Sequence, residues 1–84
     1  MELQERFEQA VAKSKQLTER PSNEVLLQLY SLYKQATEGD ITQDAPSNPF
    51  DFVAKAKHDA WSGLRGKSAT ECMQQYIDVM ESLS

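Results

Sequence analysis

Apolar side chains recur every three or four residues over most of the chain, the spacing that places them on one face of an α-helix. The pattern predicts helices over residues 2–16, 22–38 and 51–64, and a last helix over residues 68–83. No stretch alternates strictly between apolar and polar residues, as a half-buried strand does. The sequence therefore predicts an all-α four-helix bundle in which residues 1–84 form a single domain.

Capping and helix-breaking residues mark the ends of the predicted helices. Pro21 cannot continue the first helix, and Ser22 or Asn23 can cap the second because either side-chain oxygen accepts a hydrogen bond from an unpaired N–H. Gly39 stands where a helix commonly ends in a left-handed conformation. The segment Ser68-Ala-Thr-Glu71 has the spacing of a capping box, which predicts the start of the fourth helix.

The connection over residues 40–50 is long for a helical bundle, and it contains Pro46 and Pro49. A connection of this length can run along the bundle, so we expect the second and third helices to be parallel. The short link after the third helix predicts that the third and fourth helices are antiparallel neighbours. The third helix is expected to turn its apolar side chains inward: Phe52, Val53, Ala56, Ala60, Trp61 and Leu64.

Composition argues against several classes of function. The net charge is −4 and the pI about 4.8, which disfavours nucleic acids and anionic membrane surfaces as non-specific partners. The mean hydropathy is −0.64, no apolar run approaches the length of a membrane span, and the first residues lack the apolar core of a secretory signal. Cys72 has no second cysteine to pair with, and His58 has no second histidine to share a metal. These features predict a cytoplasmic protein without stable membrane insertion or a metal site.

Candidate chemistry lies on the second helix. Tyr30, Tyr33 and Lys34 are spaced i, i+3 and i+4, so they share one helix face, with Leu26 and Leu27 one turn earlier. A cation, two phenols and an apolar strip suit a ligand that combines a phosphate, a flat base and a hydrocarbon. The alternative is that the two tyrosines belong to the core and that the lysine is a solvated surface residue.

Three motifs resemble the acyl-CoA-binding protein family in order and spacing. They are Tyr30-Ser-Leu-Tyr-Lys-Gln-Ala-Thr-Glu-Gly-Asp40, Lys55-Ala-Lys-His-Asp-Ala-Trp-Ser-Gly-Leu-Arg-Gly-Lys-Ser68 and Met73-Gln-Gln-Tyr-Ile77. Together with the first helix, the resemblance covers essentially the whole chain. It implies a four-helix bundle with up-down-down-up topology and non-covalent binding of acyl-CoA.

The resemblance also implies a nucleotide-binding set of lysines and tyrosines: Lys15, Tyr30, Tyr33, Lys34, Lys57 and Tyr76. Within it, Tyr30, Lys34 and Lys57 would hold the 3′-phosphate and adenine ribose of CoA. Tyr33 would pack against the adenine, Tyr76 would contact the nucleotide, and Lys15 would lie near the phosphates. The implied acyl-chain path is Val11, Leu26 and Leu27.

The sequence departs from the family pattern at three places. His58 stands where many members carry a tryptophan, residues 45–50 form a loop one residue longer than in animal members, and Cys72 replaces a small residue. The histidine is expected to alter helix packing or ligand contacts. Cys72 is expected to act as a small hydrophobic side chain.

The resemblance predicts a monomeric carrier that binds and transports medium- to long-chain fatty acyl-CoA esters, is not an enzyme, needs no cofactor, and meets acyl-CoA-using enzymes as partners. Two alternatives come from other classes. An acyl carrier protein requires a serine for phosphopantetheine, normally in an Asp-Ser context, and the chain contains no Asp-Ser pair. A helical module that receives a partner helix on the wide apolar face of the second helix is compatible with the composition.

Overall fold

The computed structural model describes residues 2–42 and 44–83, so residues 1 and 84, the ends of the predicted single domain, lie outside the described residues. The described residues form helices and connections, without a strand. The helices are α1 (Leu3–Ser14), α2 (Asn23–Glu38), α3 (Phe52–Ser62) and α4 (Ala69–Ser82). The predicted all-α class is confirmed, and the helices are shorter than predicted by one or two residues at most ends.

Side-chain caps fix where three of the helices begin. The side chains of Ser22, Asp51 and Ser68 each accept a hydrogen bond from the backbone N–H three residues later, at 3.2, 3.0 and 3.2 Å. Each cap satisfies a donor that the first turn leaves unpaired. At the other end of α2, Gly39 has a φ of 80°, a conformation that side chains disfavour. Of the two predicted alternatives Ser22 and Asn23, Ser22 is the cap of α2, and the predicted cap at Ser68 is confirmed.

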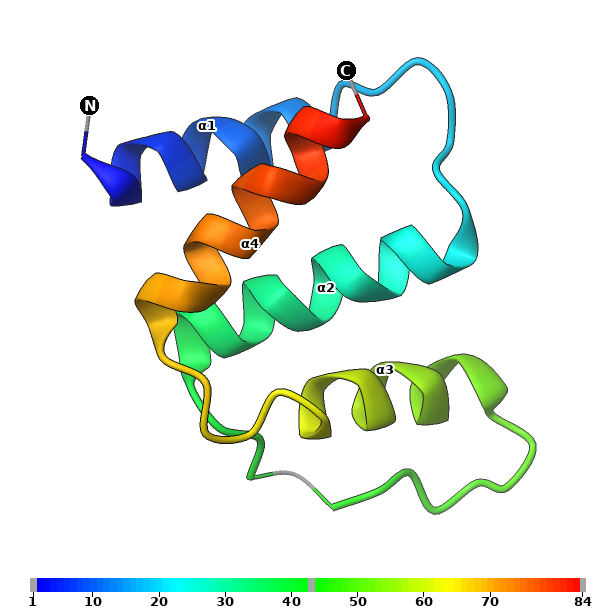
Figure 1. Cartoon of the computed structure of the whole chain (residues 1–84). Helices are drawn as coiled ribbons and strands as arrows, with labels where there is room; N and C mark the ends of the chain where they lie inside the picture. Colours follow the sequence, from blue (N-terminus) through cyan, green and yellow to red (C-terminus); the bar gives the residue numbers. More distant parts are fainter. Residues whose placement is uncertain (1, 43, 84) are drawn as a thin grey trace.

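The helices follow the predicted up-down-down-up topology. Figure 1 shows α1 and α4 running in one general direction and α2 and α3 in the other. The connection between α2 and α3 runs back along α3 before that helix begins, which makes α2 and α3 parallel. A connection much shorter than this one could not return to the starting end of α2.

The prediction that α3 and α4 are neighbours is wrong. Helix α4 packs against α1 and α2, whereas α3 packs against α2 alone, and no Cα atom of described α3 comes within 8 Å of one in α4. A short link limits only the distance between the end of one helix and the start of the next. It does not require that the two helices lie side by side, and here the apolar face of α4 is already covered by α1 and α2.

The hydrophobic core lies between α1, α2 and α4. Leu32 is 2% exposed and Cys72 is fully buried, so Cys72 packs as a small hydrophobic side chain. Helix α3 contributes no residue to this cluster. The buried members are Phe7, Ala10, Leu29, Leu32, Ala36, Cys72, Tyr76, Ile77 and Met80.

Helix α3 differs most from its prediction. Of the residues expected to face inward, Trp61 is buried, but Phe52 is 72% exposed and Val53 is 65% exposed. Their inward placement was therefore wrong. The first turn of α3 has only α2 beside it, so an apolar face that periodicity correctly identifies has no second element to cover it.

A buried glutamine joins α3 to the three-helix core. Gln35 of α2 is 1% exposed, and its carbonyl oxygen accepts a hydrogen bond from the Trp61 indole at 3.2 Å. Its amide nitrogen donates to Asp40 Oδ1 at 2.7 Å and to the Lys67 backbone oxygen at 3.0 Å. The same indole N–H also lies 2.9 Å from the Gly39 carbonyl oxygen. The Gln35 side chain thus links α2 to Trp61 of α3, to Asp40 after α2 and to Lys67 before α4.

Asp40 extends this network to the link between α3 and α4. Its Oδ1 accepts a hydrogen bond from the Gly66 backbone N–H at 2.8 Å, in addition to the one from Gln35. These hydrogen bonds, first that of Gly66 and then that of Gln35, lower the pKa of Asp40 below its ordinary value of 3.8, and the charge of Arg65 acts in the same direction.

Replacement of Gln35 by alanine is expected to destabilise the protein. The Gln35→Ala variant loses hydrogen bonds to Trp61, Asp40 and Lys67, so we expect a loss of about 2–4 kcal/mol in the free energy of unfolding. Denaturant unfolding followed by circular dichroism measures it. Gln28→Ala is the matched control, because Gln28 lies exposed on the same helix. Equal stability of the two variants would contradict this role for Gln35.

Asp40 is expected to make stability depend on pH in acid. Because folding lowers its pKa, its contribution is present above the unfolded value of 3.8 and is lost as the pH falls through the lower folded value. Unfolding in urea, measured from neutral pH downward, should show a smaller acid loss in Asp40→Asn than in wild type. Asparagine keeps the accepting oxygen without the charge. Identical pH profiles would show that Asp40 does not contribute in this way.

Candidate functional site

Two open grooves flank α2 and share part of its surface. The molecule measures 41 × 29 × 15 Å along its principal axes, so a site for a large ligand must lie at the surface. The α1–α2 groove has a volume of about 360 Å³ and is lined by Val11, Ser14, Lys15, Leu26, Leu29, Tyr30, Tyr33 and Tyr76. The α2–α3 groove has a volume of about 620 Å³ and is lined by Arg20, Asn23, Leu26, Leu27, Tyr30, Phe52, Val53, Ala56 and Lys57.

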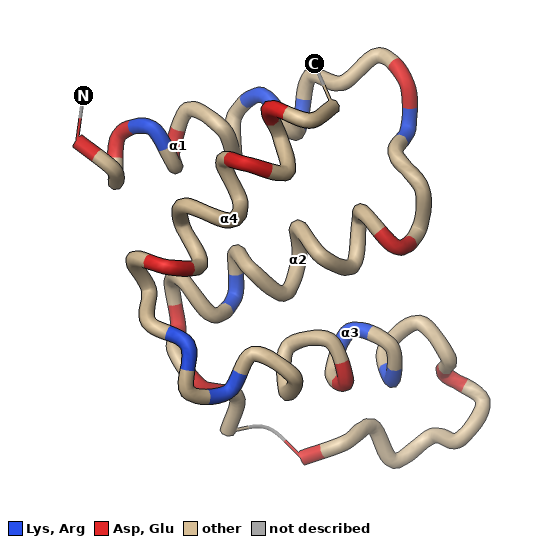
Figure 2. The backbone as a smooth tube through the Cα atoms, in the orientation of Figure 1, with Lys and Arg blue, Asp and Glu red and all other residues tan. Residues whose placement is uncertain are grey.

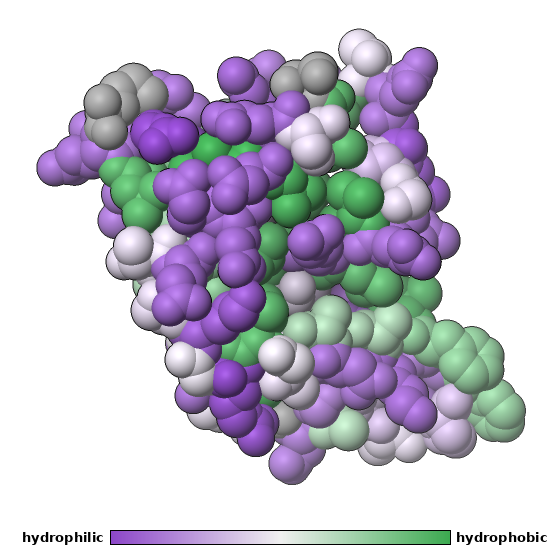
Figure 3. All heavy atoms as spheres, in the orientation of Figure 1, coloured by the Kyte–Doolittle hydropathy of each residue, from purple (hydrophilic) through white to green (hydrophobic). Residues whose placement is uncertain are grey.

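Leu26 and Tyr30 line both grooves, so they form the wall between them. Both belong to the first half of α2, which is the helix common to the core and to α3. Apolar atoms are exposed along this side of α2 and at the start of α3 (Figure 3). An extended ligand that crosses this wall would contact all four helices.

A cation and an aromatic ring meet in the α2–α3 groove. The Nζ of Lys57 lies 5.2 Å from the centroid of the Tyr30 ring, which is the geometry of a cation–π contact. The contact joins α3 to α2 at the boundary of the two grooves. It places a positive charge and a ring face together, a combination that suits phosphate and a flat base.

Three aromatic rings from three helices meet beside the α1–α2 groove, which two of them, Tyr33 and Tyr76, line. The Phe7 ring stacks on Tyr33 with centroids 6.1 Å apart and meets the edge of Tyr76 at 5.2 Å. Tyr76 is 3% exposed, and burial raises the pKa of its phenol, while a hydrogen bond with Ser14 opposes that change. Tyr33 is 41% exposed. The two predicted tyrosines of α2 therefore do not belong to the core cluster, since Tyr30 is only partly buried.

Lys34 lies beside both grooves without lining either. Its Nζ is 2.6 Å from Glu38 Oε2, one turn along α2, and 5.6 Å from the centroid of the Trp61 ring. The hydrogen bond from Lys34 to Glu38 and the charge of Glu38 raise the pKa of Lys34 above 10.5, and Tyr30 and Tyr33 contribute in the same direction. An anion that binds Lys34 therefore competes with Glu38 for it.

The structure gathers most of the predicted site residues around α2. Lys15, Tyr33, Tyr76 and Val11 meet in the α1–α2 groove, and Lys57 and Leu27 in the α2–α3 groove. The predicted acyl-chain path is consequently divided between the two grooves, with Leu26 at their boundary. The individual roles of these residues stay predictions.

Sequence reasoning missed two residues that shape the site. Phe7 of the core packs against Tyr33 and Tyr76, which line the α1–α2 groove, and Arg20, which lines the α2–α3 groove, donates to Asn23 at 3.4 Å. The i, i+3 and i+4 spacing on one helix could not reveal them, because they come from another helix and from a connection. The i, i+4 spacing of Lys34 and Glu38 was the one readable signal for the ion pair.

Other chemistry finds little support in the described residues. Among residues 2–42 and 44–83, no group of three or more His, Cys, Asp and Glu side chains is placed to hold a metal ion. Cys72 is fully buried, and burial raises the pKa of its thiol, which disfavours the reactive thiolate. None of the described helices is long and apolar enough to cross a membrane. The half-buried His58 lies beside Asp59, with Nδ1 3.7 Å from a carboxylate oxygen.

Comparison with known proteins identifies relatives over nearly the whole chain. The acyl-CoA-binding protein of Brassica napus is 48% identical over 83 residues, which are 99% of this chain and 89% of that protein. The enoyl-CoA delta isomerase 2 of Rattus norvegicus is 49% identical over 81 residues, 96% of this chain. This chain spans only 20% of the length of that isomerase.

Solved structures and a family model agree with these relatives. Acyl-CoA-binding protein 2 of Oryza sativa superposes with a TM-score of 0.89 at 44% identity, over 98% of this chain and 90% of that one. The acyl-CoA-binding protein of Moniliophthora perniciosa gives a TM-score of 0.85 at 32% identity, over 94% of this chain and 76% of that one. The model of the acyl-CoA-binding protein family matches residues 4–80, and the chain belongs to that family.

Proposed function

We propose that this protein binds medium- to long-chain fatty acyl-CoA reversibly, and buffers and transports it in the cytoplasm. In this role it acts as a monomer, needs no cofactor, and releases the thioester unchanged to the enzymes that use it. The observation that carries the proposal is the pair of grooves that meet at Leu26 and Tyr30, with lysines at their rims. Membership of the acyl-CoA-binding protein family supports the same ligand.

The nucleotide end of the ligand is assigned to the lysine and tyrosine cluster. Lys57 and Tyr30 offer a cation against a ring, and Lys15 adds a second cation across α2. Tyr33 and Tyr76 supply ring surface for the adenine. Lys34 joins this cluster once a phosphate replaces Glu38 as its partner. Because Lys34 and Glu38 are both partly exposed, that exchange costs little.

The acyl chain is assigned to the apolar wall formed by Val11, Leu26 and Leu27. Each buried methylene contributes about 0.8 kcal/mol, so about ten of them contribute roughly 8 kcal/mol before the ordering costs of binding. The head group alone lacks this contribution. Long-chain thioesters should therefore bind far more tightly than free CoA.

A calorimetric titration of the purified protein with palmitoyl-CoA tests the proposal, with free CoA and palmitate as separate controls. Saturable one-to-one binding of the thioester, much tighter than that of either control, is the expected result. Absence of binding would reject the function. Tight binding of a helical peptide without any response to the thioester would instead favour a protein-interaction module.

Replacing head-group lysines is expected to weaken thioester and CoA binding alike. A charge-assisted hydrogen bond contributes about 1.5–3 kcal/mol, so Lys57→Ala should weaken the binding of both ligands roughly tenfold or more. Added salt should reduce the difference in affinity between the variant and wild type. Lys34→Ala and Tyr30→Phe should also weaken binding without unfolding the domain. Lys13→Ala is the matched control, because Lys13 is exposed on α1 and lines neither groove. Equal losses in the Lys57 and Lys13 variants would refute the head-group assignment.

Replacing a residue of the apolar wall is expected to weaken the binding of palmitoyl-CoA but not that of CoA. Leu27→Ser removes apolar surface from the α2–α3 groove, so binding of palmitoyl-CoA should weaken about fivefold to tenfold while binding of CoA is unchanged. Calorimetry with both ligands gives the two affinities. If CoA and its thioester lost affinity equally, Leu27 would lie beside the head group and the acyl-chain path would be misassigned.

A further inference from the structure

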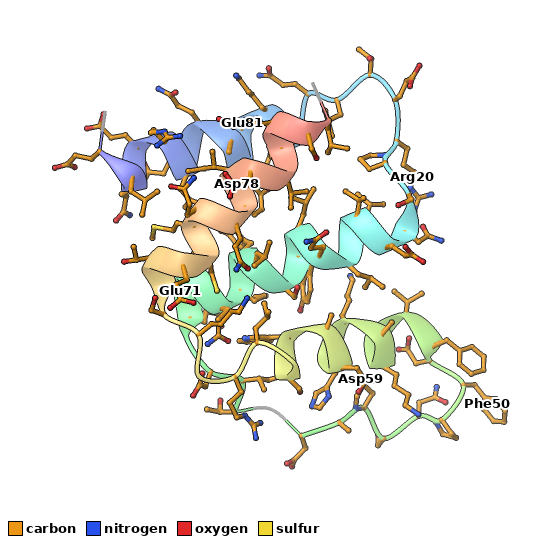
Figure 4. The ribbon with its side chains drawn as sticks, viewed as in Figure 1. Arg20, Phe50, Asp59, Glu71, Asp78 and Glu81 are labelled. Carbon is orange, nitrogen blue, oxygen red and sulfur yellow. The ribbon has the colours of Figure 1, made fainter. Side chains whose placement is uncertain are left out.

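The first turn of α3 and the residue before its cap expose an apolar surface that the core does not explain. Phe50 is 80% exposed, and together with Phe52 and Val53 it forms what we call the apolar tip. Apart from these three, Tyr33 is the only large hydrophobic residue exposed in the described chain. Figure 4 shows Phe50 at a corner of the molecule, with its ring directed away from the helices.

A well-formed turn holds the apolar tip in its exposed position. Asn48 accepts hydrogen bonds from the Phe50 N–H at its side-chain oxygen and from the Asp51 N–H at its backbone oxygen, at 2.9 and 3.1 Å. The Phe52 N–H donates to the Phe50 carbonyl oxygen at 3.1 Å, and Pro49 restricts the backbone between Asn48 and Phe50. The exposure of the phenylalanines is therefore built into the backbone of the turn.

The net charge of −4 disfavours anionic surfaces for the molecule as a whole, but the lysines next to the apolar tip favour one locally. Lys55 and Lys57 follow Phe52 and Val53 at i+3 and i+4, so they stand one turn behind the tip. The nearby Asp51 is engaged as the cap of α3, with Oδ1 3.0 Å from the Ala54 nitrogen. Figure 2 shows that α4, whose charged residues are all acidic, lies on the other side of the molecule from the start of α3.

We propose that the apolar tip docks this protein on the surface of a phospholipid bilayer that contains anionic lipid. One helical turn rises 5.4 Å, and interfacial apolar groups enter about 5–10 Å into the head-group boundary. Insertion of Phe50, Phe52 and Val53 to that depth brings both lysines of α3 to the level of the lipid phosphates. The docked molecule turns the mouth of the α2–α3 groove toward the bilayer, because Phe52 and Val53 also line that groove.

A protein partner fits the apolar tip less well. Stable protein interfaces bury about 800 Å² on each partner, whereas the tip is three side chains on a convex corner. A bilayer, by contrast, adapts its shape to a protruding group. The attachment is peripheral and reversible.

Vesicle sedimentation of the whole protein tests the docking. Wild type should bind vesicles of mixed phosphatidylcholine and phosphatidylserine more tightly than vesicles of phosphatidylcholine alone. The double variant Phe50→Ser/Phe52→Ser should lose about tenfold or more of the partition coefficient, with its helix content unchanged by circular dichroism. Failure of wild type to bind either vesicle, or equal binding of the double variant, would overturn the proposal.

Two further variants examine charge and depth. Lys55→Gln should reduce the preference for phosphatidylserine severalfold, whereas Lys13→Gln, the same change of charge on α1, should not. A Phe50→Trp variant should shift its emission to shorter wavelength on the mixed vesicles, since the only native tryptophan, Trp61, is already buried. Equal effects of the two lysine changes, or an unchanged emission, would contradict insertion of the tip.

The wild-type protein could instead self-associate in the absence of lipid. If the double variant abolished that self-association, the apolar tip would be assigned to a dimer contact and the docking proposal would be overturned.

Discussion

The hydrogen bonds of Gln35 join α3 to a fold whose main apolar core that helix does not enter. Helices α1, α2 and α4 share a continuous apolar core, but α3 adds no residue to it. At one end of α2, the buried amide of Gln35 forms hydrogen bonds with Trp61, Asp40 and the Lys67 backbone. These bonds fix the position of α3. Because buried polar groups are costly when unpaired, this network also specifies a unique position for α3. The distance between α2 and α3, and hence the width of the groove between them, follows from it.

That position turns α2 into the common wall of two grooves. One face of the helix meets α1 and α4, another meets α3, and Leu26 and Tyr30 lie at the boundary. The proposed ligand orientation follows from the side chains that line the grooves. Tyrosine rings and lysine ammonium groups contact the nucleotide, whereas two leucines and a valine contact the hydrocarbon chain. The same arrangement leaves the first turn of α3 uncovered, because a helix supported at its far end by Trp61 has only α2 beside its beginning. The larger groove and the exposed apolar tip therefore both follow from the position of α3, which has only α2 beside its first turn.

The local part of the fold could be predicted from the sequence, and the long-range part could not. Periodicity and capping residues located the four helices, and the length of the connection before α3 gave the direction of that helix. Periodicity also named Phe52 and Val53 as an apolar face, but it carries no information on whether another element covers that face. Gln35 gave no sign of burial, because its partners come from segments that only the folded chain brings together. For the site, residue types and the resemblance located the region around α2, and the i, i+4 spacing could have revealed the Lys34–Glu38 ion pair. The contact of Tyr33 with Phe7 could not be predicted, because Phe7 comes from another helix.

The most direct test of the central claim, that the grooves on either side of α2 form one ligand site, is a nuclear magnetic resonance titration of the protein with palmitoyl-CoA. Backbone amide signals of Ser14 and Lys15 report on the α1–α2 groove, and those of Val53 and Ala56 on the α2–α3 groove. The account predicts that both sets shift together and reach saturation at the same ratio of ligand to protein. Shifts confined to one groove, or two sets that saturate at different ratios, would contradict it.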